Sequence, residues 1–529
     1  MVLLATILGT TVVTVDSTVT NVALPAIERD LGGGLAGQQW TSNAYLLTLG
    51  SLLLIGGSLG DVYGERRVFA AGVVGFGATS LICAIAPTIG VLVAARALQG
   101  VSGALLTPAA LAVIVTTFSP EERGRAVGAW TAWGGVGTVL GPLVGGQLVD
   151  SASWRWIFVI NLPIVVVTLL LILRVVAPGH PNRDAKVDVP GAALCAAGLG
   201  AGTFGLIEQP LHGWGSPGVW LPLILGVLLF AAFLVYEARA KVPMLPLGLF
   251  RKRNFAIGNV ETFAMYGGLG LLFFLLVLYL QQVAGYTALA AGTSALPVTL
   301  LMFALSPRFG ALADRHGPRL FMGCGPLIAA AGLALLLRLD STVGYLTDLL
   351  PALVVFGLGL SMTVAPLTAT VLAAADEHNA GIASGVNNAI ARVAGLVAIA
   401  AVGAVITAYF GARLDDRLGP LASRPPLAAQ LEQAKRQPLA RPSVHGVSPA
   451  LAARVDRAGV DASISAFRLG MGVSAVLVAL GGALGLAGIQ NPRRVVRSAE
   501  CSGGNLAGVP REAALQSPCE WHRPVPEAA

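Results

Sequence analysis

The sequence GSLGDVYGERR at residues 57–67 returns in altered form as GALADRHGPR at residues 310–319. Each copy is a short charged turn that contains glycines, and each lies between two blocks of apolar residues. Asp61 and Asp314 occupy the same place in the two copies. We interpret the pair as an internal repeat, in which each half of the chain carries this turn after its second helix.

Long apolar blocks flank both turns, such as VFAAGVVGFGATSLICAIA at residues 68–86. The chain is 55% hydrophobic and 12% charged, with a mean hydropathy of +0.76, whereas a soluble domain carries about twice that charged fraction. A helix needs about 20 apolar residues to cross a membrane, and its backbone polar groups must be satisfied internally. The blocks are long and do not alternate strictly. We therefore predict an all-α membrane protein and exclude a β-barrel.

Fourteen blocks meet the length criterion for a membrane helix: 3–25, 40–59, 68–86, 89–115, 127–148, 156–176, 189–208, 218–237, 255–280, 289–312, 319–338, 349–373, 381–409 and 467–489. The repeat groups them into two six-helix bundles with two inserted central helices. We expect an N-terminal six-helix bundle at 1–177, two inserted helices with linkers at 178–250, a C-terminal six-helix bundle at 251–490, and a disordered tail at 491–529. Residues 410–466 are expected to form a long outer loop within the second bundle.

Basic residues indicate the orientation of these helices. Cytoplasmic loops of membrane proteins carry an excess of Lys and Arg, and most basic loop residues fall on one face of the predicted arrangement: Arg66, Arg67, Arg123, Arg125, Arg183, Lys186, Arg239, Lys241, Arg251, Lys252, Arg253, Arg315, Arg319, Arg493, Arg494 and Arg497. The segment 410–466 is basic on the other face, but loops near 60 residues cross largely regardless of charge. We expect a multi-pass inner (plasma) membrane protein with both termini in the cytoplasm.

Several other classes are disfavoured by the sequence. The net charge of +7 is spread over short loops and does not form one continuous face, so no nucleic acid is expected as a partner. The five cysteines lack the spacing of a zinc site or a disulfide framework. No GxxxxGK[ST], HExxH or GxSxG motif is present, which argues against ATP-driven transport and against an enzyme. We expect no metal and no cofactor.

A string of small residues lies in the predicted fifth helix. Gly137, Gly141 and Gly145 fall on one face, where a neighbouring helix can approach closely, and Pro142 removes a backbone hydrogen bond and permits a bend. Gly146 completes the string Gly-x-x-x-Gly-Pro-x-x-Gly-Gly.

Two charged residues of opposite sign are predicted at similar depth in the membrane. Arg96, in the fourth helix, is about 10 Å from the outer end, and Asp16, in the first helix, is about 14 Å from it. The two could face each other across a cavity, and a buried carboxylate near an arginine is a candidate proton-binding site. A structural ion pair, or an arginine that snorkels to the surface, is the alternative. Thr18 and Asn21 follow Asp16 on the same helix.

Two further ionisable residues lie within predicted helices of the second bundle. Glu261 is about 9 Å from the cytoplasmic end of its helix and is a candidate for binding a cation or a second proton. Arg392 lies near the middle of the segment 381–409 and could pair with Glu261 or with another acid.

Together these motifs resemble the major facilitator superfamily, and in particular its fourteen-helix drug–proton antiporters of the EmrB/QacA type. The resemblance covers about residues 10–490. It rests on the repeated turns, on Arg96-x-x-Gln99-Gly100, on the string around Pro142, and on Asp16-x-Thr18-x-x-Asn21-x-Ala-Leu-Pro in the first helix.

The resemblance implies a function and a role for each motif. The protein would export drugs or other amphipathic small molecules across the inner membrane in exchange for protons, by alternating access, as a monomer in the lipid bilayer. The proton gradient would be its only energy source. Proton coupling and the substrate cavity would involve Asp16, Arg96, Glu261, Arg392, Thr18 and Asn21. A conformational latch would consist of Gly57, Asp61, Gly64, Arg66, Arg67, Asp314 and Arg315, and the antiporter helix would carry Gly137, Gly141, Pro142, Gly145 and Gly146.

Two alternatives stay open at this point. The protein could be a dedicated exporter of one metabolite or antibiotic that confers self-resistance, because an apolar cavity with few polar groups serves broad and narrow substrate ranges equally well. It could also be a sensor that has the same fold and does not transport, although Asp16, Arg96 and the string around Pro142 argue against that.

Overall fold

The structure is a computed structural model that describes residues 1–177, 187–241, 243–375, 380–422, 427–442 and 444–491. These residues form helices and connecting turns, and no β-strand occurs among them. The α-helices are α1 (Val2–Leu31), α2 (Gly34–Tyr63), α3 (Glu65–Ala84), α4 (Ile89–Thr117), α5 (Pro120–Ser151), α6 (Trp156–Val159), α7 (Asn161–Val175), α8 (Val189–His212), α9 (Pro217–Glu237), α10 (Arg253–Gln282), α11 (Ala288–Thr293), α12 (Leu296–His316), α13 (Pro318–Leu335), α14 (Leu350–Ala373), α15 (Ala380–Leu418), α16 (Leu427–Lys435) and α17 (Pro449–Gly488).

Twelve helical segments in the described part of the chain are long and apolar enough to cross a membrane. The prediction of an all-helical, multi-pass membrane protein is therefore confirmed. α2 and α5 are also long, at 30 and 32 residues, but they do not belong to those twelve. The count of fourteen membrane helices stays a prediction. The expected tail from 492 onward lies outside the described residues.

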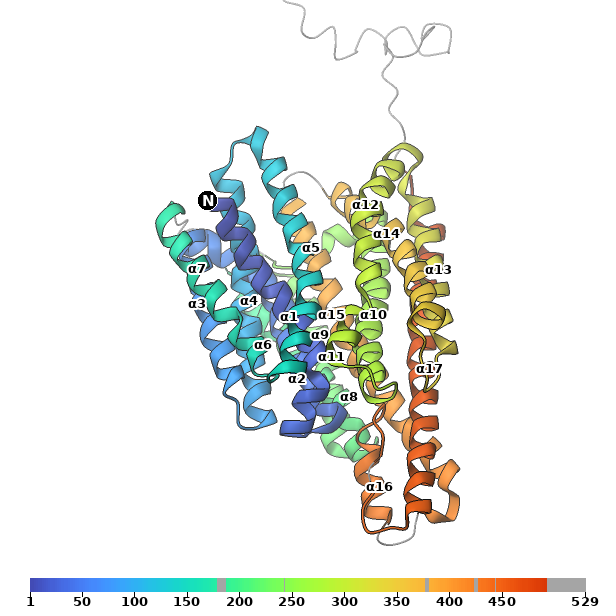
Figure 1. Cartoon of the computed structure of the whole chain (residues 1–529). Coiled ribbons are helices and arrows are strands. Elements are labelled where there is room, and N and C mark those ends of the chain that lie inside the picture. Colours follow the sequence, from blue (N-terminus) through green and yellow to red (C-terminus); the bar gives the residue numbers. More distant parts are fainter. Residues whose placement is uncertain (178–186, 242, 376–379, 423–426, 443, 492–529) are drawn as a thin grey trace, which may run out of the picture. The chain divides into compact units, whose positions relative to one another are not determined.

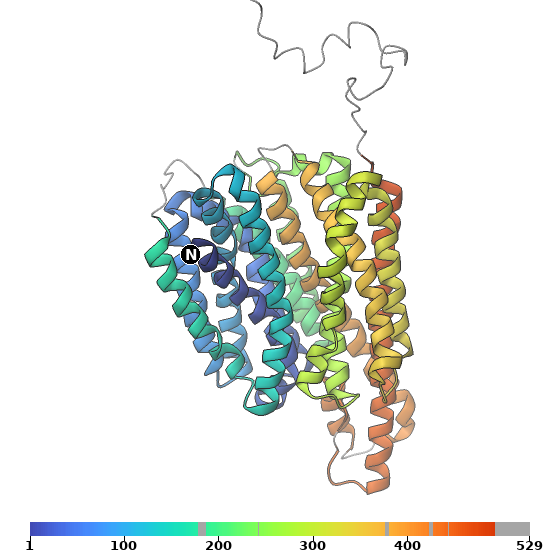
Figure 2. The same cartoon turned by 45° about the horizontal axis from the view of Figure 1, so that its top comes forward.

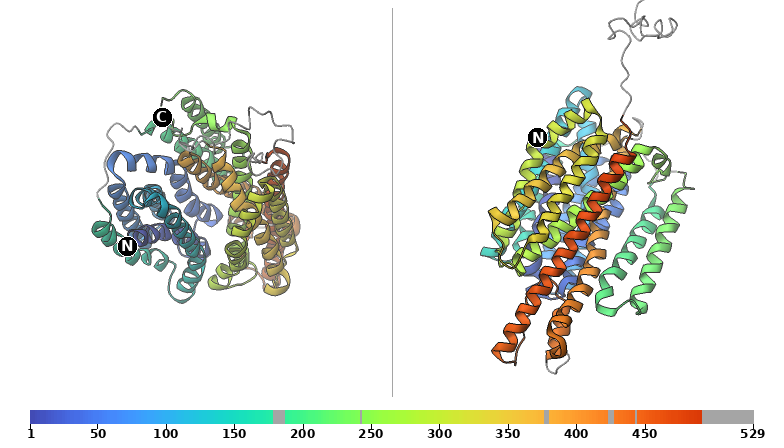
Figure 3. Two further views of the ribbon diagram at one scale, coloured as in Figure 1. Left: turned by 90° about the horizontal axis from the view of Figure 1, so that it is seen from above. Right: turned by 90° about the vertical axis from the view of Figure 1, so that its right-hand side faces the viewer.

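The helices pack in two groups. One group contains α1–α7 and the other contains α10–α17, and they lie on opposite sides of the view in Figure 1 and the left panel of Figure 3. The groups meet where α2 packs against α15 and where α5 packs against α11. The hairpin of α8 and α9 stands beside them and reaches α2 and α15 through α8.

The repeated turn adopts one conformation in both groups. α2 ends at Tyr63 and is followed by Gly64, with φ 88° and ψ 135°. α12 ends at His316 and is followed by Gly317, with φ 89° and ψ 148°. Positive φ is strained for residues that carry a Cβ, which explains why glycine stands at the same place in both copies.

α5 uses its glycines on two faces. A Cβ on Gly137 would lie 3.4 Å from Thr14, and one on Gly145 would lie 3.0 Å from Val19, so this face packs closely against α1, as the spacing indicates. Gly146 points to the other group, where a Cβ would lie 2.7 Å from the backbone nitrogen of Leu289 in α11. One helix therefore holds both groups at close range.

The segment 410–466, which the sequence predicted as a long outer loop, contains helices. α15 continues to Leu418, α16 occupies part of the segment, and α17 begins at Pro449, so the three helices project beyond the rest of the second group (Figure 2). Leucines on their inner faces are almost fully buried, among them Leu414, Leu427 and Leu431. A criterion based on continuous apolar length overlooks such amphipathic helices, because their charged side chains stay on the outside.

Hydrogen bonds join the two groups at the lower end in Figure 1, where α1 gives way to α2. The Asp150 carboxylate of α5 accepts bonds from the backbone nitrogens of Ala288 and Leu289, at 3.0 and 2.8 Å, and so caps α11. Further links come from the projecting helices and from α10: Leu35 N to Arg436 O, Gln437 to Glu28, and Gln281 to Val22 O. These bonds join the two groups at the lower end.

Candidate functional site

A charge pair is buried between α1 and α4. Arg96 Nη1 lies 2.5 Å from Asp16 Oδ2, and each side chain is 1% exposed. The sequence predicted that these two residues lie at similar depth. They do not face each other across a cavity, however. They touch directly in the interface of neighbouring helices.

The carboxylate of Asp16 has further hydrogen-bond donors from two helices. Oδ1 accepts bonds from Gln99 Nε2 and Asn161 Nδ2, each at 2.9 Å. Both amides also donate to Ser80 Oγ on α3, at 2.9 and 3.2 Å. Burying a charge is costly unless it is paired and hydrogen-bonded. Asp16 meets both conditions through residues of α4 and α7.

Arg96 connects this network to an internal cavity. Its Nε donates to Thr41 O at 3.1 Å, and its guanidinium carbon lies 4.3 Å above the ring of Tyr45, a geometry in which a cation is attracted to the ring face. Arg96 and Tyr45 also line the cavity. One guanidinium therefore contacts both Asp16 and the space in which a ligand could bind.

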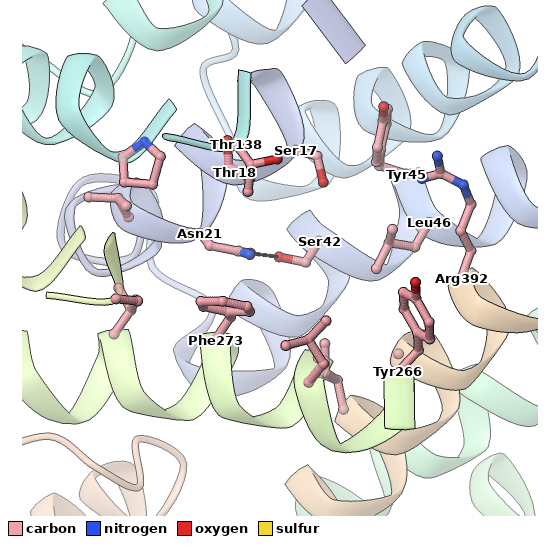
Figure 4. A pocket seen from close by; sticks show the side chains of 18 of the residues that line it. Ser17, Thr18, Asn21, Ser42, Tyr45, Leu46, Thr138, Tyr266, Phe273 and Arg392 are labelled. Atoms are coloured by element: carbon pink, nitrogen blue, oxygen red, sulfur yellow. Dashed lines mark hydrogen bonds between the residues drawn. The ribbon is translucent and has the colours of Figure 1, made fainter. Parts of the chain in front are cut away.

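The cavity has a volume of about 360 Å³ and lies between the two groups of helices (Figure 4). α1, α2 and α5 contribute one wall, and α10, α12 and α15 contribute another. No acidic residue is found among its described lining residues. The polar lining consists of Ser17, Thr18, Asn21, Ser42, Tyr45, Arg96, Thr138, Tyr266, Thr299, Asn388 and Arg392.

Thr18 and Asn21 lie in the cavity wall. The Thr18 hydroxyl donates within its own helix, to Thr14 O and Val15 O at 3.0 Å. Asn21 Oδ1 accepts a bond from Ser42 on α2, at 3.3 Å (Figure 4). The motif that begins at Asp16 therefore supplies one buried charge and two polar lining residues.

Arg392 enters the cavity from α15, beside Tyr45 and Tyr266 (Figure 4). Among the residues that the structure describes, it has no ion-pair or hydrogen-bond partner. The expected pairing with Glu261 is therefore not present.

Glu261 does not line the cavity. It is fully buried on α10, and both carboxyl oxygens lack a hydrogen-bond partner. Its carboxyl group points toward Gly485 of α17, on the other side of its helix from a cavity-lining position. Glu261, which the resemblance groups with proton coupling and the substrate cavity, therefore lies outside the cavity. An apolar segment in the sequence shows where a charged residue lies along its helix, but not in which direction its side chain points.

The residues of the two repeated turns lie at the upper end in Figure 1, away from the cavity. Arg66 Nη2 donates to Leu173 O at 2.7 Å and thereby ties α3 to the end of α7. Arg67, Asp314 and Arg315 are exposed, and Gly57 lies near Pro108 of α4. The side chain of Asp61 lies outside the described residues.

Residues 6–399 match the family model described as Major Facilitator Superfamily. That match spans well over half of the chain. The chain belongs to the Major Facilitator Superfamily. It is therefore a membrane transporter and not an enzyme. Within the described residues, no group of three or more His, Cys, Asp or Glu side chains is placed to hold a metal.

Three relatives share about a third or more of their residues with this transporter. The puromycin resistance protein of Streptomyces alboniger is 39% identical over 76% of this chain and 81% of its own. The tetracenomycin C resistance and export protein of Streptomyces glaucescens is 35% identical over 78% and 77%. The cephamycin export protein of Amycolatopsis lactamdurans is 36% identical over 73% and 80%.

Solved structures support the fold alone. A bacterial homolog of the human lysosomal transporter Spinster has a TM-score of 0.60 at 18% identity, covering 93% of this chain and 98% of its own. The POT family transporter PepTSo reaches the same TM-score at 12% identity, covering 92% of this chain and 97% of its own.

Four residues of the transporter's site were not singled out by the sequence. Gln99 was part of a quoted motif, but its bond to Asp16 was not foreseen. Asn161 is an amide at the start of an apolar block, and such an isolated polar residue was the available signal. Tyr45 and Tyr266 carry no comparable signal in the sequence.

The charge pair leads to a prediction about stability. Arg96→Met removes the cation and leaves the Asp16 carboxylate buried without a counter-charge, so we expect a loss of about 3–5 kcal/mol. Combining Arg96→Met with Asp16→Asn removes both charges and should restore most of that loss. Thermal unfolding of the detergent-purified protein, followed by intrinsic fluorescence, measures both effects.

The control is Arg155→Met, which breaks the pair of Arg155 and Asp30 at the surface. Their side chains are 36% and 46% exposed, so water can replace the lost partner and little change is expected. Equal unfolding temperatures for Arg96→Met and Arg155→Met would show that the buried pair contributes nothing special.

Proposed function

We propose that this transporter exports amphipathic, drug-like molecules across the inner membrane in exchange for protons, by alternating access. The observation that carries the proposal is the contact of one residue, Arg96, with both the buried Asp16 carboxylate and the cavity. Relatives named for antibiotic resistance and export support the direction of transport. Proton binding and substrate binding would be linked through Arg96.

The exchange would proceed as follows. In the present conformation Asp16 pairs with Arg96 and accepts hydrogen bonds from Arg96, Gln99 and Asn161, so a charge buried here is compensated. A proton that reaches Asp16 from outside would remove the charge that holds Arg96. The released guanidinium would then take up space and hydrogen bonds in the cavity that the substrate uses. Loss of the proton to the cytoplasm would return Arg96 to Asp16 and reopen the site.

We further propose that α2 and α5 also cross the bilayer, which gives the fourteen helices of the EmrB/QacA-type antiporters. Their lengths exceed the span of a membrane. The chain would then divide into an N-terminal bundle at 1–177, two inserted helices at 178–250, a C-terminal bundle at 251–490 and a cytoplasmic tail at 491–529. The packing of α8 and α9 beside the two groups is consistent with that division.

The antiporter string and the turns would control access. Contacts of α5 with α1 and α11 support a role for the glycines around Pro142 in closing the lower end, which we place outside the cell. The structure would then be the inward-facing state. The turns would form the conformational latch of the opposite, cytoplasmic end, through Gly57, Asp61, Gly64, Arg66, Arg67, Asp314 and Arg315. The protein would act as a monomer in the lipid bilayer and would need no cofactor.

A dedicated exporter of one antibiotic is the second candidate. It is favoured by relatives whose names give a single compound, such as puromycin or tetracenomycin C, whereas another relative, from Mycobacterium tuberculosis, is named a multidrug resistance protein. Expression in a bacterial strain without its own pumps, challenged with unrelated drugs, separates the two. Protection against a single chemical class indicates the dedicated exporter.

Proton coupling predicts the behaviour of Asp16→Asn. The amide keeps the size and accepts hydrogen bonds but cannot titrate, so uptake against a concentration difference should fall to the level of empty vesicles. The assay is accumulation of a transported dye in proteoliposomes with an imposed pH gradient. Asp30→Asn on the same helix removes an exposed carboxylate and should transport normally. Normal gradient-driven uptake by Asp16→Asn would place proton coupling elsewhere.

The proposed orientation predicts which residues face outward. In a variant without native cysteines, Ala453→Cys, exposed at the lower end, should react with a membrane-impermeant maleimide in intact cells. His316→Cys, exposed at the upper end, should react only after lysis. The opposite pattern of labelling would invert the topology.

A further inference from the structure

Glu261 is a buried acid that the proposed exchange does not use. It is the ninth residue of α10 and is 0% exposed. A Cβ on Gly485 of α17 would lie 2.8 Å from its Oε2, and one on Gly481 would lie 3.9 Å from its Cγ. The carboxyl group therefore rests against the backbone of α17, at two positions that have no side chain.

α13 closes the third side of this space. A Cβ on Gly485 would also lie 2.6 Å from the carbonyl oxygen of Met322, so α10, α13 and α17 meet at Gly485. Neither the glycines of α17 nor the backbone of Met322 brings a charge, and neither carboxyl oxygen of Glu261 has a hydrogen-bond partner. We name the space between Glu261, Gly481, Gly485 and Met322 the Glu261 pocket.

Among the residues that the structure describes, none on a neighbouring helix supplies a counter-charge to the Glu261 pocket. α14 presents Leu367 and Val371 to α10 beside Gly258, and α15 presents the neutral Asn387, which donates to Asn259 and Thr262. The basic side chains of this region are engaged elsewhere. They are Arg253, bonded to Ala487 O and Gly488 O, Arg319, bonded to Leu486 O, and Arg392 in the cavity.

This environment distinguishes the two protonation states of Glu261. An ionised carboxylate that has neither hydrogen bond nor counter-ion is strongly disfavoured inside a membrane protein. The neutral acid fits the space as it stands. Separation of α10 from α17 at Gly481 and Gly485 would admit water from the nearby end of α17 and allow the proton to leave. Helix separation and proton release would then be parts of one event.

We infer that Glu261 is a second proton-binding site, outside the substrate cavity, that is occupied in this conformation and emptied when α10 and α17 separate. Asp16 and Glu261 then each bind and release one proton in a cycle, and two protons cross for each substrate. The inference rests on the proposed proton-coupled export. The inference adds to that function a ratio of two protons per substrate and a second proton site outside the substrate cavity.

The stoichiometry can be measured in proteoliposomes at steady state. Valinomycin with equal K⁺ on both sides clamps the membrane potential at zero. If n protons are exchanged per substrate, the steady-state ratio of substrate inside to outside the vesicles changes about 10ⁿ-fold for each unit of pH difference across the membrane. For a dye that the wild type transports, we expect about 100-fold per pH unit. Glu261→Gln keeps a neutral side chain in the pocket and should still transport, at about tenfold per pH unit. Glu432→Gln, at a side chain that is 68% exposed, should match the wild type.

The outcomes separate the inference from the function on which it rests. If the steady-state substrate ratio depends on the pH difference equally in the wild type and in Glu261→Gln, the inference is overturned and proton-coupled export stands. A wild-type ratio that does not respond to the pH gradient overturns proton-coupled export itself. A purely structural role of Glu261 would change the amount of folded protein or the rate of uptake, but not the steady-state ratio.

Chemical labelling of the wild type tests the site without a substitution. Dicyclohexylcarbodiimide reacts with protonated carboxyl groups in apolar surroundings. The carboxyl O–H adds across a C=N bond to give an O-acylisourea, and its acyl group then shifts from oxygen to nitrogen, which leaves a stable N-acylurea that carries the whole reagent. Peptide mass spectrometry at neutral pH should find this adduct on Glu261 and not on Asp16, which is paired with Arg96. An adduct on Asp16 with Glu261 unmodified would overturn the inference.

Discussion

A carboxylate and a guanidinium buried together in an apolar bundle impose the main constraint on this structure. Asp16 and Arg96 are each 1% exposed, and removing two charges from water costs several kcal/mol per ion unless geometry and hydrogen bonds compensate. Compensation comes from α2, α3, α4 and α7, through Thr41 O and the side chains of Ser80, Gln99 and Asn161. The first group of helices is therefore organised around one ionic contact.

α5 transmits that organisation to the second group. Its glycines allow close contact with α1, which carries Asp16, and Gly146 meets α11 on the other side. Asp150, near the end of the same helix, caps α11 through two backbone nitrogens. A shift of α1 caused by a change at Asp16 would consequently reach the contacts that close the lower end. At these glycines the backbones of the two helices are in direct contact, so one helix cannot move independently of the other.

The sequence predicted those features that depend on position along a helix. The length of the apolar blocks predicted the helices. The similar depth of Asp16 and Arg96 in their helices indicated that they could interact, because an uncompensated charge in a membrane requires a partner. The repeated turn gave Gly64 and Gly317, since positive φ restricts the residue type. Thr18, Asn21 and Arg392, which the resemblance assigns to proton coupling and the substrate cavity, line the cavity.

Features that depend on helix rotation or on distant packing were not predictable. Glu261 points toward α17 and not toward the cavity, because the glycines at 481 and 485 leave room there, and nothing near Glu261 in the sequence reveals them. Tyr45 and Tyr266 reach the cavity through the crossing of α2, α10 and α15. The projecting helices of 410–466 are held by buried leucines such as Leu414 and Leu431, and a search for continuous apolar blocks does not detect that pattern.

The central claim is that Asp16 binds and releases a proton while it remains inside the bundle. Infrared difference spectroscopy of the purified protein in lipid, recorded while the pH is lowered, observes that event directly and needs no substrate. The account predicts a carbonyl band of a protonated carboxylic acid that appears in the wild type and is missing from Asp16→Asn. Identical difference spectra for the two proteins would contradict the claim.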